Sequence, residues 1–204
     1  MANEVMICNL ALSRVGEEGS VVSLDPPEGG EHASACAAFY QTSLATMLAA
    51  HDWRFATRRV RLTELLGVDT HGWKAVYGAP SDSLRIIDIR SAEDTRHEVR
   101  TPSAHYEIET DGKNARIYTD CVSPICRYIV SSPNVGSFPP LFVDALAWHL
   151  AMSLSGRVIK GRDGVQITNA CLQQYQNMLA QAAAKDAGEK DLPIDFTPEW
   201  IKVR

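Results

Sequence analysis

Apolar residues recur at helical spacing in two stretches near the start of the chain. Residues 3–15 predict a first helix, which the side chain of Asn3 can cap and Gly16 can end. Residues 31–51 predict a second helix. The stretch between them, residues 16–30, holds two prolines and four glycines and predicts a loop. The expected buried stripes are Val5, Cys8, Leu12 and Val15 in the first helix and Phe39, Leu44, Met47 and Leu48 in the second.

Two more helical patterns follow in the last third of the chain. Residues 140–158 are apolar on nearly all sides, which predicts a central buried helix with Pro140 in its first turn. Residues 164–188 are amphipathic. The short connection between the two predicts antiparallel neighbours. The apolar face of the second helix is Leu172, Tyr175, Leu179 and Ala182, and its polar face is Gln173, Gln174, Gln176 and Asn177.

The middle of the chain, about residues 54–131, has the alternation and the turn signals of β-strands. Residues 82–89 carry apolar side chains on both faces, which is typical of a central strand. Residues 106–119 predict a hairpin whose turn lies at 111–114. Residues 125–132 predict one more strand, which the prolines that follow bring to an end.

This order of elements predicts an α+β fold: a helical bundle of about four helices, with a small antiparallel β-sheet inserted between the two helix pairs. We expect residues 1–190 to form a single domain. Residues 191–204 show no periodicity, yet they keep large apolar side chains in which a disordered tail is poor. They predict an extended arm that docks on its own body or on another subunit. The apolar residues of the arm are Leu192, Ile194, Phe196, Trp200 and Ile201.

Composition narrows the possible functions. The chain has 204 residues, 45% of them apolar, and a net charge of −5. This charge argues against nucleic-acid binding driven by the whole protein, although a local basic patch stays possible. The first residues lack the basic region of a secretory signal. The most apolar stretch, residues 141–159, contains Asp144 and His149, so we interpret it as a buried helix rather than a membrane span.

The sequence lacks the motifs of phosphate loops, dinucleotide sites, zinc proteases and serine hydrolases. Its five cysteines are odd in number and accompany no secretory signal, which predicts reduced thiols. The spacing of Cys121 and Cys126 permits a metal pair, but no second pair follows, and zinc normally needs four ligands. We therefore interpret them as small apolar residues, and we expect neither a metal nor a cofactor.

The titratable side chains form no recognisable catalytic pattern. His149 lies on the most apolar helix and does not share a face with Asp144, which favours a packed histidine over a catalytic one. Glu107 and Glu109 alternate outward on a predicted strand, which favours a solvated face, and the glutamates at 17–18 lie in a loop. We expect no catalytic residue and no enzyme activity.

The stretch HDWRFATRRVRL, residues 51–62, allows two interpretations. Basic residues interleaved with aromatics can bind nucleic acid, or a helix can end here and continue into an edge strand. A stacking platform needs several aromatics on one exposed face, whereas Trp53 and Phe55 directly follow an apolar helix. An extended chain also divides the arginines between two faces. We favour a buried Trp53 and Phe55, with arginines that pair with acidic groups. The arginines are Arg54, Arg58, Arg59 and Arg61.

Four motifs follow one another in the chain: HDWRFATRRVRL, WKAVYGAPSDSLRIIDI, FPPLFVDALAWHLAMSLSG and AQAAAKDAGE. Together they resemble the head–tail adaptors of short-tailed phages, the family called tail tubular protein A or tail accessory (connector) protein. In that family a helix ends in Trp-x-Phe-Ala with basic residues after it. A Tyr-x-x-Pro-x-Asp segment, here Tyr77, Pro80 and Asp82, then leads into a strand. The resemblance covers about residues 3–190. The arm is similar only in being extended and in ending near a Trp and basic residues.

The resemblance implies a structural protein of the virion or of a prophage. Family members bind the portal protein, form a ring of twelve subunits that extends the DNA channel, and receive the tail nozzle protein. Contact with packaged DNA is transient, and no cofactor or membrane is involved. The implied location is the head–tail junction of the virion, after synthesis in the host cytoplasm. Subunit or portal contacts are expected at Arg54, Arg58, Arg59, Arg61, Leu192, Ile194, Phe196, Trp200, Lys202 and Arg204.

The alternative is a DNA-binding accessory protein that uses the basic segment 54–61, which predicts duplex binding that weakens steeply with salt. A cell-wall hydrolase carried on the tail has only scattered carboxylates to support it. If the adaptor interpretation holds, we expect that deletion of residues 191–204 weakens portal docking without unfolding the body.

Overall fold

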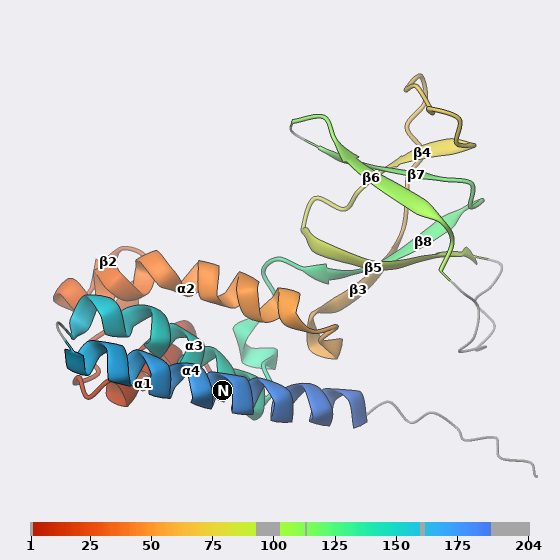
Figure 1. The fold of residues 1–204 in the computed structure, drawn as a ribbon. Helices are drawn as coiled ribbons and strands as arrows, with labels where there is room; N and C mark the ends of the chain where they lie inside the picture. Colours follow the sequence, from red (N-terminus) through yellow and green to blue (C-terminus); the bar gives the residue numbers. More distant parts are fainter. Residues whose placement is uncertain (1, 93–102, 113, 160–161, 189–204) are drawn as a thin grey trace, which may run out of the picture.

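The chain, in a computed structural model, is described over residues 2–92, 103–112, 114–159 and 162–188. Within these residues, four α-helices form a helical body, and a β module of six strands projects from one end of it (Figure 1). The predicted α+β fold is thereby confirmed. The helices are α1 (Glu4–Arg14), α2 (Gly30–Ala50), α3 (Pro140–Val158) and α4 (Arg162–Gly188). The strands of the module are β3 (Thr57–Arg61), β4 (Ala75–Gly78), β5 (Ser83–Ser91), β6 (Tyr106–Thr110), β7 (Ala115–Thr119) and β8 (Pro124–Val130).

The first two helices follow the predicted pattern closely. The Asn3 side chain caps α1 and accepts a hydrogen bond from the backbone N–H of Met6 at 2.7 Å. Gly16 ends the helix in the left-handed region, with φ at +85°. Helix α2 ends at Ala50, where His51 is already extended. The predicted stripes are buried, except that Val5 and Phe39 are only half-buried.

The predicted loop at 16–30 contains a short hairpin, β1 (Ser23–Leu24) and β2 (Pro27–Glu28). Val21 is buried, whereas Val22 is 69% exposed. Gly29 has φ at +125°, and a Cβ atom there would lie 2.3 Å from the backbone oxygen of Ser20. Only glycine fits this close approach.

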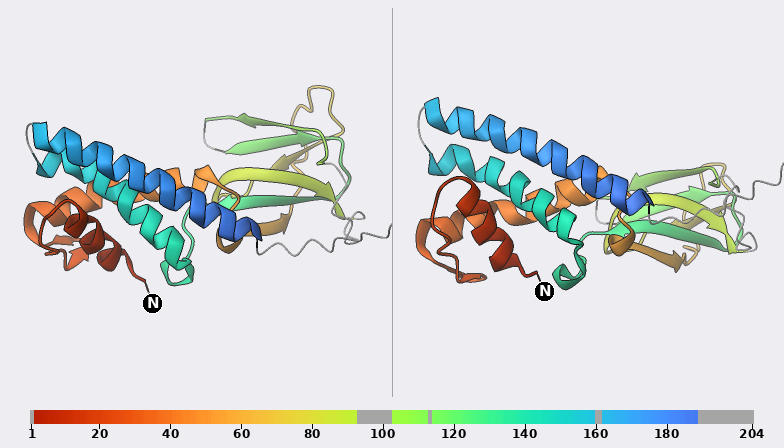
Figure 2. Two further views of the ribbon diagram at one scale, coloured as in Figure 1. Left: turned by 60° about the horizontal axis from the view of Figure 1, so that its bottom comes forward. Right: turned by 90° about the horizontal axis from the view of Figure 1, so that it is seen from below.

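Helix α3 is the centre of the helical body, as its apolar sequence predicts. It packs against α1, α2 and α4. Figure 2 shows α3 and α4 side by side, and they run antiparallel after a short connection. Helix α4 begins two residues earlier than predicted, at Arg162. The guanidinium of Arg14 joins α1 to α3, because it pairs with Asp144 and lies 4.2 Å above the Trp148 ring.

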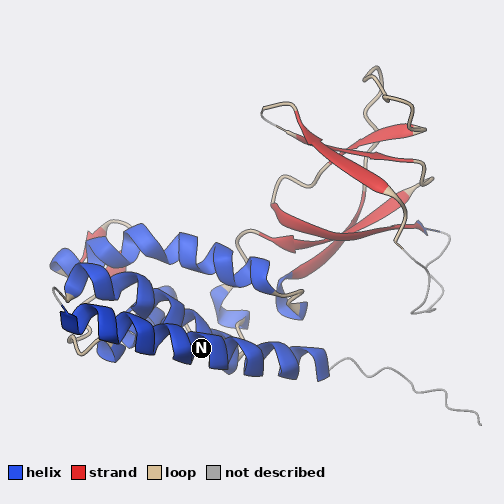
Figure 3. Cartoon of the chain, viewed as in Figure 1, coloured by secondary structure: helices blue, strands red, loops and turns tan. Residues whose placement is uncertain are grey.

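The β module has two three-stranded antiparallel sheets rather than the single small sheet predicted (Figure 3). The strand orders are β3–β8–β5 and β4–β7–β6, and an isolated bridge between Glu64 and Tyr77 links the two sheets. The predicted hairpin is confirmed as β6 and β7. A cluster of buried apolar residues continues from the helices into both sheets.

The prediction that residues 82–89 form a central strand is wrong. Strand β5 lies at the edge of its sheet, and β8 is central. The pairing register of β5 shifts between Ile86 and Asp88, which leaves Ile87 as an extra residue. Ile86 and Ile89 therefore lie on the same face, opposite Tyr128 and Cys126 on β8. The bulge, and not a central position in the sheet, explains why apolar residues occur at both even-numbered and odd-numbered positions of this strand.

Candidate interaction surface at the junction and on the β module

Trp53 fixes the point where the chain leaves the helical body. Its side chain is 1% exposed, and its indole N–H donates to the backbone oxygen of Met47 at 2.7 Å. Phe142 of α3 meets the indole edge-on, with ring centroids 4.9 Å apart. Phe55 packs on Phe138 and Phe142 at 5.3 and 4.8 Å. The predicted burial of Trp53 is confirmed, and Phe55 is half-buried against the same aromatic group.

Asp186, near the end of α4, holds the same junction from the other side. Only 8% of this residue is exposed. Its carboxylate accepts a hydrogen bond from the backbone N–H of Arg54 at 3.2 Å and lies 3.2 Å from Nε2 of His51. Segments separated by more than 130 residues are thus tied together by one carboxylate.

The arginines of residues 54–61 do not form one surface. Arg54 lies in the 3-10 turn η1 (Arg54–Ala56), before the strand begins. Arg58 points to the face of β3 that carries Tyr128 of β8, and both side chains bind Asp82, at 3.1 and 2.9 Å. Arg59 and Arg61 point to the opposite face and are exposed. Within the described part of the chain, neither has an ion-pair partner.

Arginines from the two neighbouring strands join Arg59 and Arg61 on that face. The pairing register places Arg59 opposite Arg127 of β8, and Arg127 opposite Asp88 of β5. We call this set the arginine face. Its members are Arg59, Arg61, Arg85, Arg90 and Arg127.

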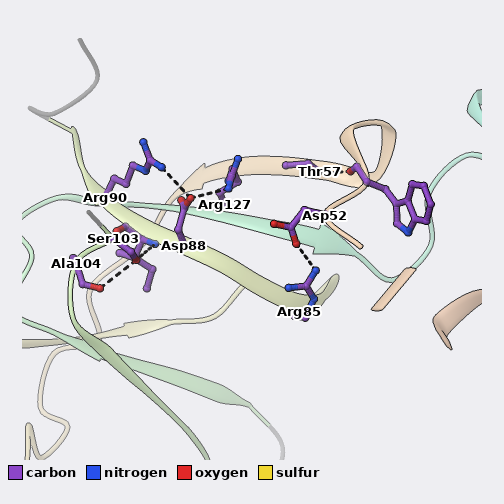
Figure 4. Close-up of polar contacts among 10 residues, drawn as sticks. Asp52, Thr57, Arg85, Asp88, Arg90, Ser103, Ala104 and Arg127 are labelled. Atoms are coloured by element: carbon purple, nitrogen blue, oxygen red, sulfur yellow. Dashed lines mark hydrogen bonds and ion pairs between the residues drawn. The ribbon is translucent and has the colours of Figure 1, made fainter. Parts of the chain in front are cut away.

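A single buried carboxylate organises the centre of the arginine face (Figure 4). Asp88 is 7% exposed and receives Arg127 at 2.9 Å and Arg90 at 3.3 Å. Arg85 pairs with Asp52, the residue just before the Trp53 anchor. Three of the five arginines thus pair with two carboxylates, so this face carries positive charge although the whole chain has a net charge of −5.

Sequence reasoning found Arg59 and Arg61 but missed Arg85, Arg90, Arg127 and Asp88. The signal was present as alternating charge in DSLRIIDIR and in ICRYIV. It could be used only with the strand order β3–β8–β5, which depends on contacts between distant parts of the chain.

The opposite charge gathers on β6, at the edge of the other sheet. Glu107 and Glu109 are exposed, as predicted, and Ile108 between them is 47% exposed. Arg116 on β7 lies opposite Glu109 but pairs with Asp111 at 2.6 Å. Among the residues that the structure describes, neither glutamate has an ion-pair partner.

A small cavity of about 140 Å³ adjoins the Trp53 anchor. It lies between the start of α3 and the end of α4, and it is mostly apolar apart from two charged side chains at one side. Its lining is Trp53, Pro139, Pro140, Leu141, Phe142, Ala182, Lys185 and Asp186. No convergent set of nucleophile and base accompanies it within the described residues.

The remaining candidates for chemistry are packed into the fold. His149 meets the Tyr175 ring edge-on at 4.9 Å, and burial lowers the pKa of its imidazole. Its Nδ1 is buried and has no hydrogen-bond partner in the described residues. Cys126 is buried, and burial raises the pKa of its thiol to about 12, whereas Cys121 is half-exposed. Residues 2–92, 103–112, 114–159 and 162–188 hold no group of three or more His, Cys, Asp or Glu side chains arranged to bind a metal ion.

The arm residues Leu192, Ile194, Phe196, Trp200, Lys202 and Arg204 lie outside the described residues. None of the described helices combines the length and the apolar composition that crossing a membrane requires. No protein-family model matches the chain, and no curated protein matches it.

Proposed function

We propose that this chain is a structural head-to-tail adaptor of a short-tailed phage or prophage. In this role it binds the portal protein, forms a ring that extends the DNA channel, and receives the tail nozzle protein. The ring is expected to have twelve subunits, with transient contact to packaged DNA, at the head–tail junction of the virion. The chain acts without a cofactor and catalyses no reaction.

The observation that carries the proposal is that the motifs of the phage-adaptor resemblance contact one another in the fold. Trp53 and Phe55 of the first motif pack on Phe138 and Phe142 of the third. Asp82 of the second motif binds Arg58 of the first. The motif order thus matches a structural unit, in which an aromatic junction joins a helical body to a projecting β module.

The charge distribution also supports a structural role. An acidic body does not hold DNA tightly, which suits a channel through which DNA must pass. The positive arginine face and the acidic strand β6 are local exceptions that suit contacts between proteins.

The test is to mix the purified chain with the portal protein encoded in the same genome and to image the product by electron microscopy. We expect a chain that is largely monomeric or weakly associated on its own and a ring on the portal. A portal that stays bare in excess chain contradicts the proposal.

A DNA-binding accessory protein is the second candidate, and the arginine face favours it. Basic side chains from three neighbouring strands can contact phosphates. A gel shift with duplex DNA at low salt tests this candidate, and binding must weaken steeply as salt rises. No shift at low salt removes it.

A further inference from the structure

We propose that strand β3 of one subunit pairs edge to edge with strand β6 of the next subunit, in parallel orientation, with Val60 beside Ile108. The occupant of each open edge is thus a second copy of this chain. The inference rests on the proposed ring and names the surface that builds it.

The first observation is that, among the residues that the structure describes, no strand pairs with the outer edge of β3; we call this an open edge. Strand β3 is the outer strand of the order β3–β8–β5. The N–H of Leu62 donates to the oxygen of Pro124 on β8 at 3.0 Å. Hydrogen-bonded residues alternate in an antiparallel pair, so the backbone groups of Arg59 and Arg61 point away from β8. Beyond Leu62 this side is occupied by β4, through the N–H of Gly78 and the oxygen of Thr63. The open edge is therefore the length of β3 itself.

The second observation is that the outer edge of β6 is likewise open with respect to residues 2–92, 103–112, 114–159 and 162–188. Strand β6 is the outer strand of the order β4–β7–β6. The N–H of Asp111 donates to the oxygen of Asn114 at 3.2 Å. By the same alternation, the backbone groups of Tyr106, Ile108 and Thr110 point away from β7.

The two open edges carry matching patterns of opposite charge. Strand β3 reads Arg59-Val60-Arg61, and strand β6 reads Glu107-Ile108-Glu109. Val60 is 39% exposed and Ile108 is 47% exposed, although both lie near the middle of a strand. Monomeric proteins normally shield or shorten edges of this kind.

Backbone geometry selects the parallel orientation for this match. In a parallel pair, a residue whose N–H and C=O point to the partner lies beside a residue whose groups point away. The backbone groups of Arg59 point away from β8, toward the proposed partner strand. Those of Glu107 point toward β7, away from the partner strand, so the two residues can be neighbours in a parallel pair. The register that joins Val60 to Ile108 then joins Arg59 to Glu107 and Arg61 to Glu109. In an antiparallel pair, the backbone groups of two opposite residues either both point to the partner or both point away, so Val60 could not lie opposite Ile108.

The charges also exclude the competing contacts. Pairing of β3 with another β3 places arginine against arginine, and pairing of β6 with another β6 places glutamate against glutamate. Among these three contacts, only the one between β3 and β6 brings opposite charges together. A contact between two different surfaces of one chain is head-to-tail, and it closes into a ring when the rotation between subunits permits.

A charge-swap experiment tests the pairing. One variant carries Arg59→Glu and Arg61→Glu, and the other carries Glu107→Arg and Glu109→Arg. Association of each variant alone should weaken at least about tenfold relative to the unmodified chain in sedimentation velocity at low salt. In an equal mixture every junction regains opposite charges, so association should return. The pairing is overturned if neither swap weakens association. It is also overturned if the swaps weaken association but mixing the two variants does not restore it.

The matched control carries Arg157→Glu and Lys185→Glu, two exposed positions on the helical body, with the same change in net charge as the first variant. Its association should equal that of the unmodified chain.

A second measurement does not depend on the swaps. Val60→Cys with Ile108→Cys should give crosslinked multimers with a short bismaleimide, in a chain that also carries Cys121→Ser. Val122→Cys, at a residue that is 70% exposed, replaces Ile108→Cys as the control and should leave the chain uncrosslinked. Absence of multimers with the first pair overturns the pairing even if a swap variant fails to fold.

Ring assembly on the portal protein distinguishes the proposed adaptor function from the proposed pairing of β3 with β6. Rings that assemble on the portal from either swap variant alone contradict the pairing but keep the adaptor function. Swap-sensitive association and rescue, together with a portal that stays bare, contradict the adaptor function but keep the pairing.

Discussion

The helical body and the β module use charge in opposite ways. At the centre of the body, α3 buries an apolar series that includes Leu146, Leu150 and Leu154, each fully buried. The β module instead buries Asp88 among arginines, and the charged strands β3 and β6 are outer strands of its two sheets. The body therefore supplies most of the apolar burial that stabilises the fold, and the module supplies the surfaces that can recognise a partner.

The largest expected effect comes from removal of the anchor that joins the two regions. Trp53→Ala should lower the free energy of unfolding by about 4 kcal/mol, because a fully buried indole and its hydrogen bond are lost. Thermal and urea unfolding measure this. Trp73→Ala is the control, since Trp73 is half-buried and stacks on His105, and it should cost about 1 kcal/mol. Equal costs would show that Trp53 is no special anchor.

The next effect should appear within the β module alone. Asp88→Asn removes the negative charge that Arg90 and Arg127 share and should cost about 2 kcal/mol. Hydrogen exchange should rise in β5 and β8 more than in α3. Asp69→Asn is the control, because the Asp69 side chain is 78% exposed, and it should change stability by less than about 0.5 kcal/mol. A uniform rise in exchange across both regions would argue against a local role.

A smaller effect should follow at the junction itself. Asp186→Asn weakens the contacts to His51 and to the backbone of Arg54 and should cost about 1 kcal/mol. A double-mutant cycle with His51→Gln measures the coupling, and the double variant should lose less than the sum of the two single losses. Strict additivity would mean that the two side chains do not interact.

The smallest effect concerns pH and the helical body. Burial lowers the pKa of His149 below its ordinary value of 6.5. Below that value the unfolded chain takes up a proton that the folded protein takes up only at lower pH, so stability falls as pH drops from 6.5 toward the folded pKa. His149→Phe should flatten this part of the stability profile. An unchanged slope in the His149→Phe variant would contradict this expectation.

The helices could be predicted from the sequence because their signals are local. Periodicity, the Asn3 cap and the stop at Gly16 act within a few residues, and the predicted limits agree with the structure to within about two residues. The burial of Trp53 followed from its position directly after an apolar helix.

The sheet arrangement and the arginine face could not be predicted in the same way. The bulge at Ile87 produces the apolar pattern that is typical of a central strand, although β5 lies at the edge of its sheet. Arg127 reaches Asp88 only because β8 pairs with β5. Asp186 reaches Arg54 across a separation of 132 residues, for which the sequence carries no local signal.

The aromatic junction brings the two ends of the β module together. Phe55 before the module and Phe138 after it have ring centroids 5.3 Å apart. The whole module is thus an insertion whose two ends are neighbours, the arrangement in which domain exchange is best tolerated. A short linker in place of residues 57–135 should leave a stand-alone bundle, and the same two positions could accept the module of another protein. The helical body can in this sense act as a scaffold on which the β module is exchanged as one piece.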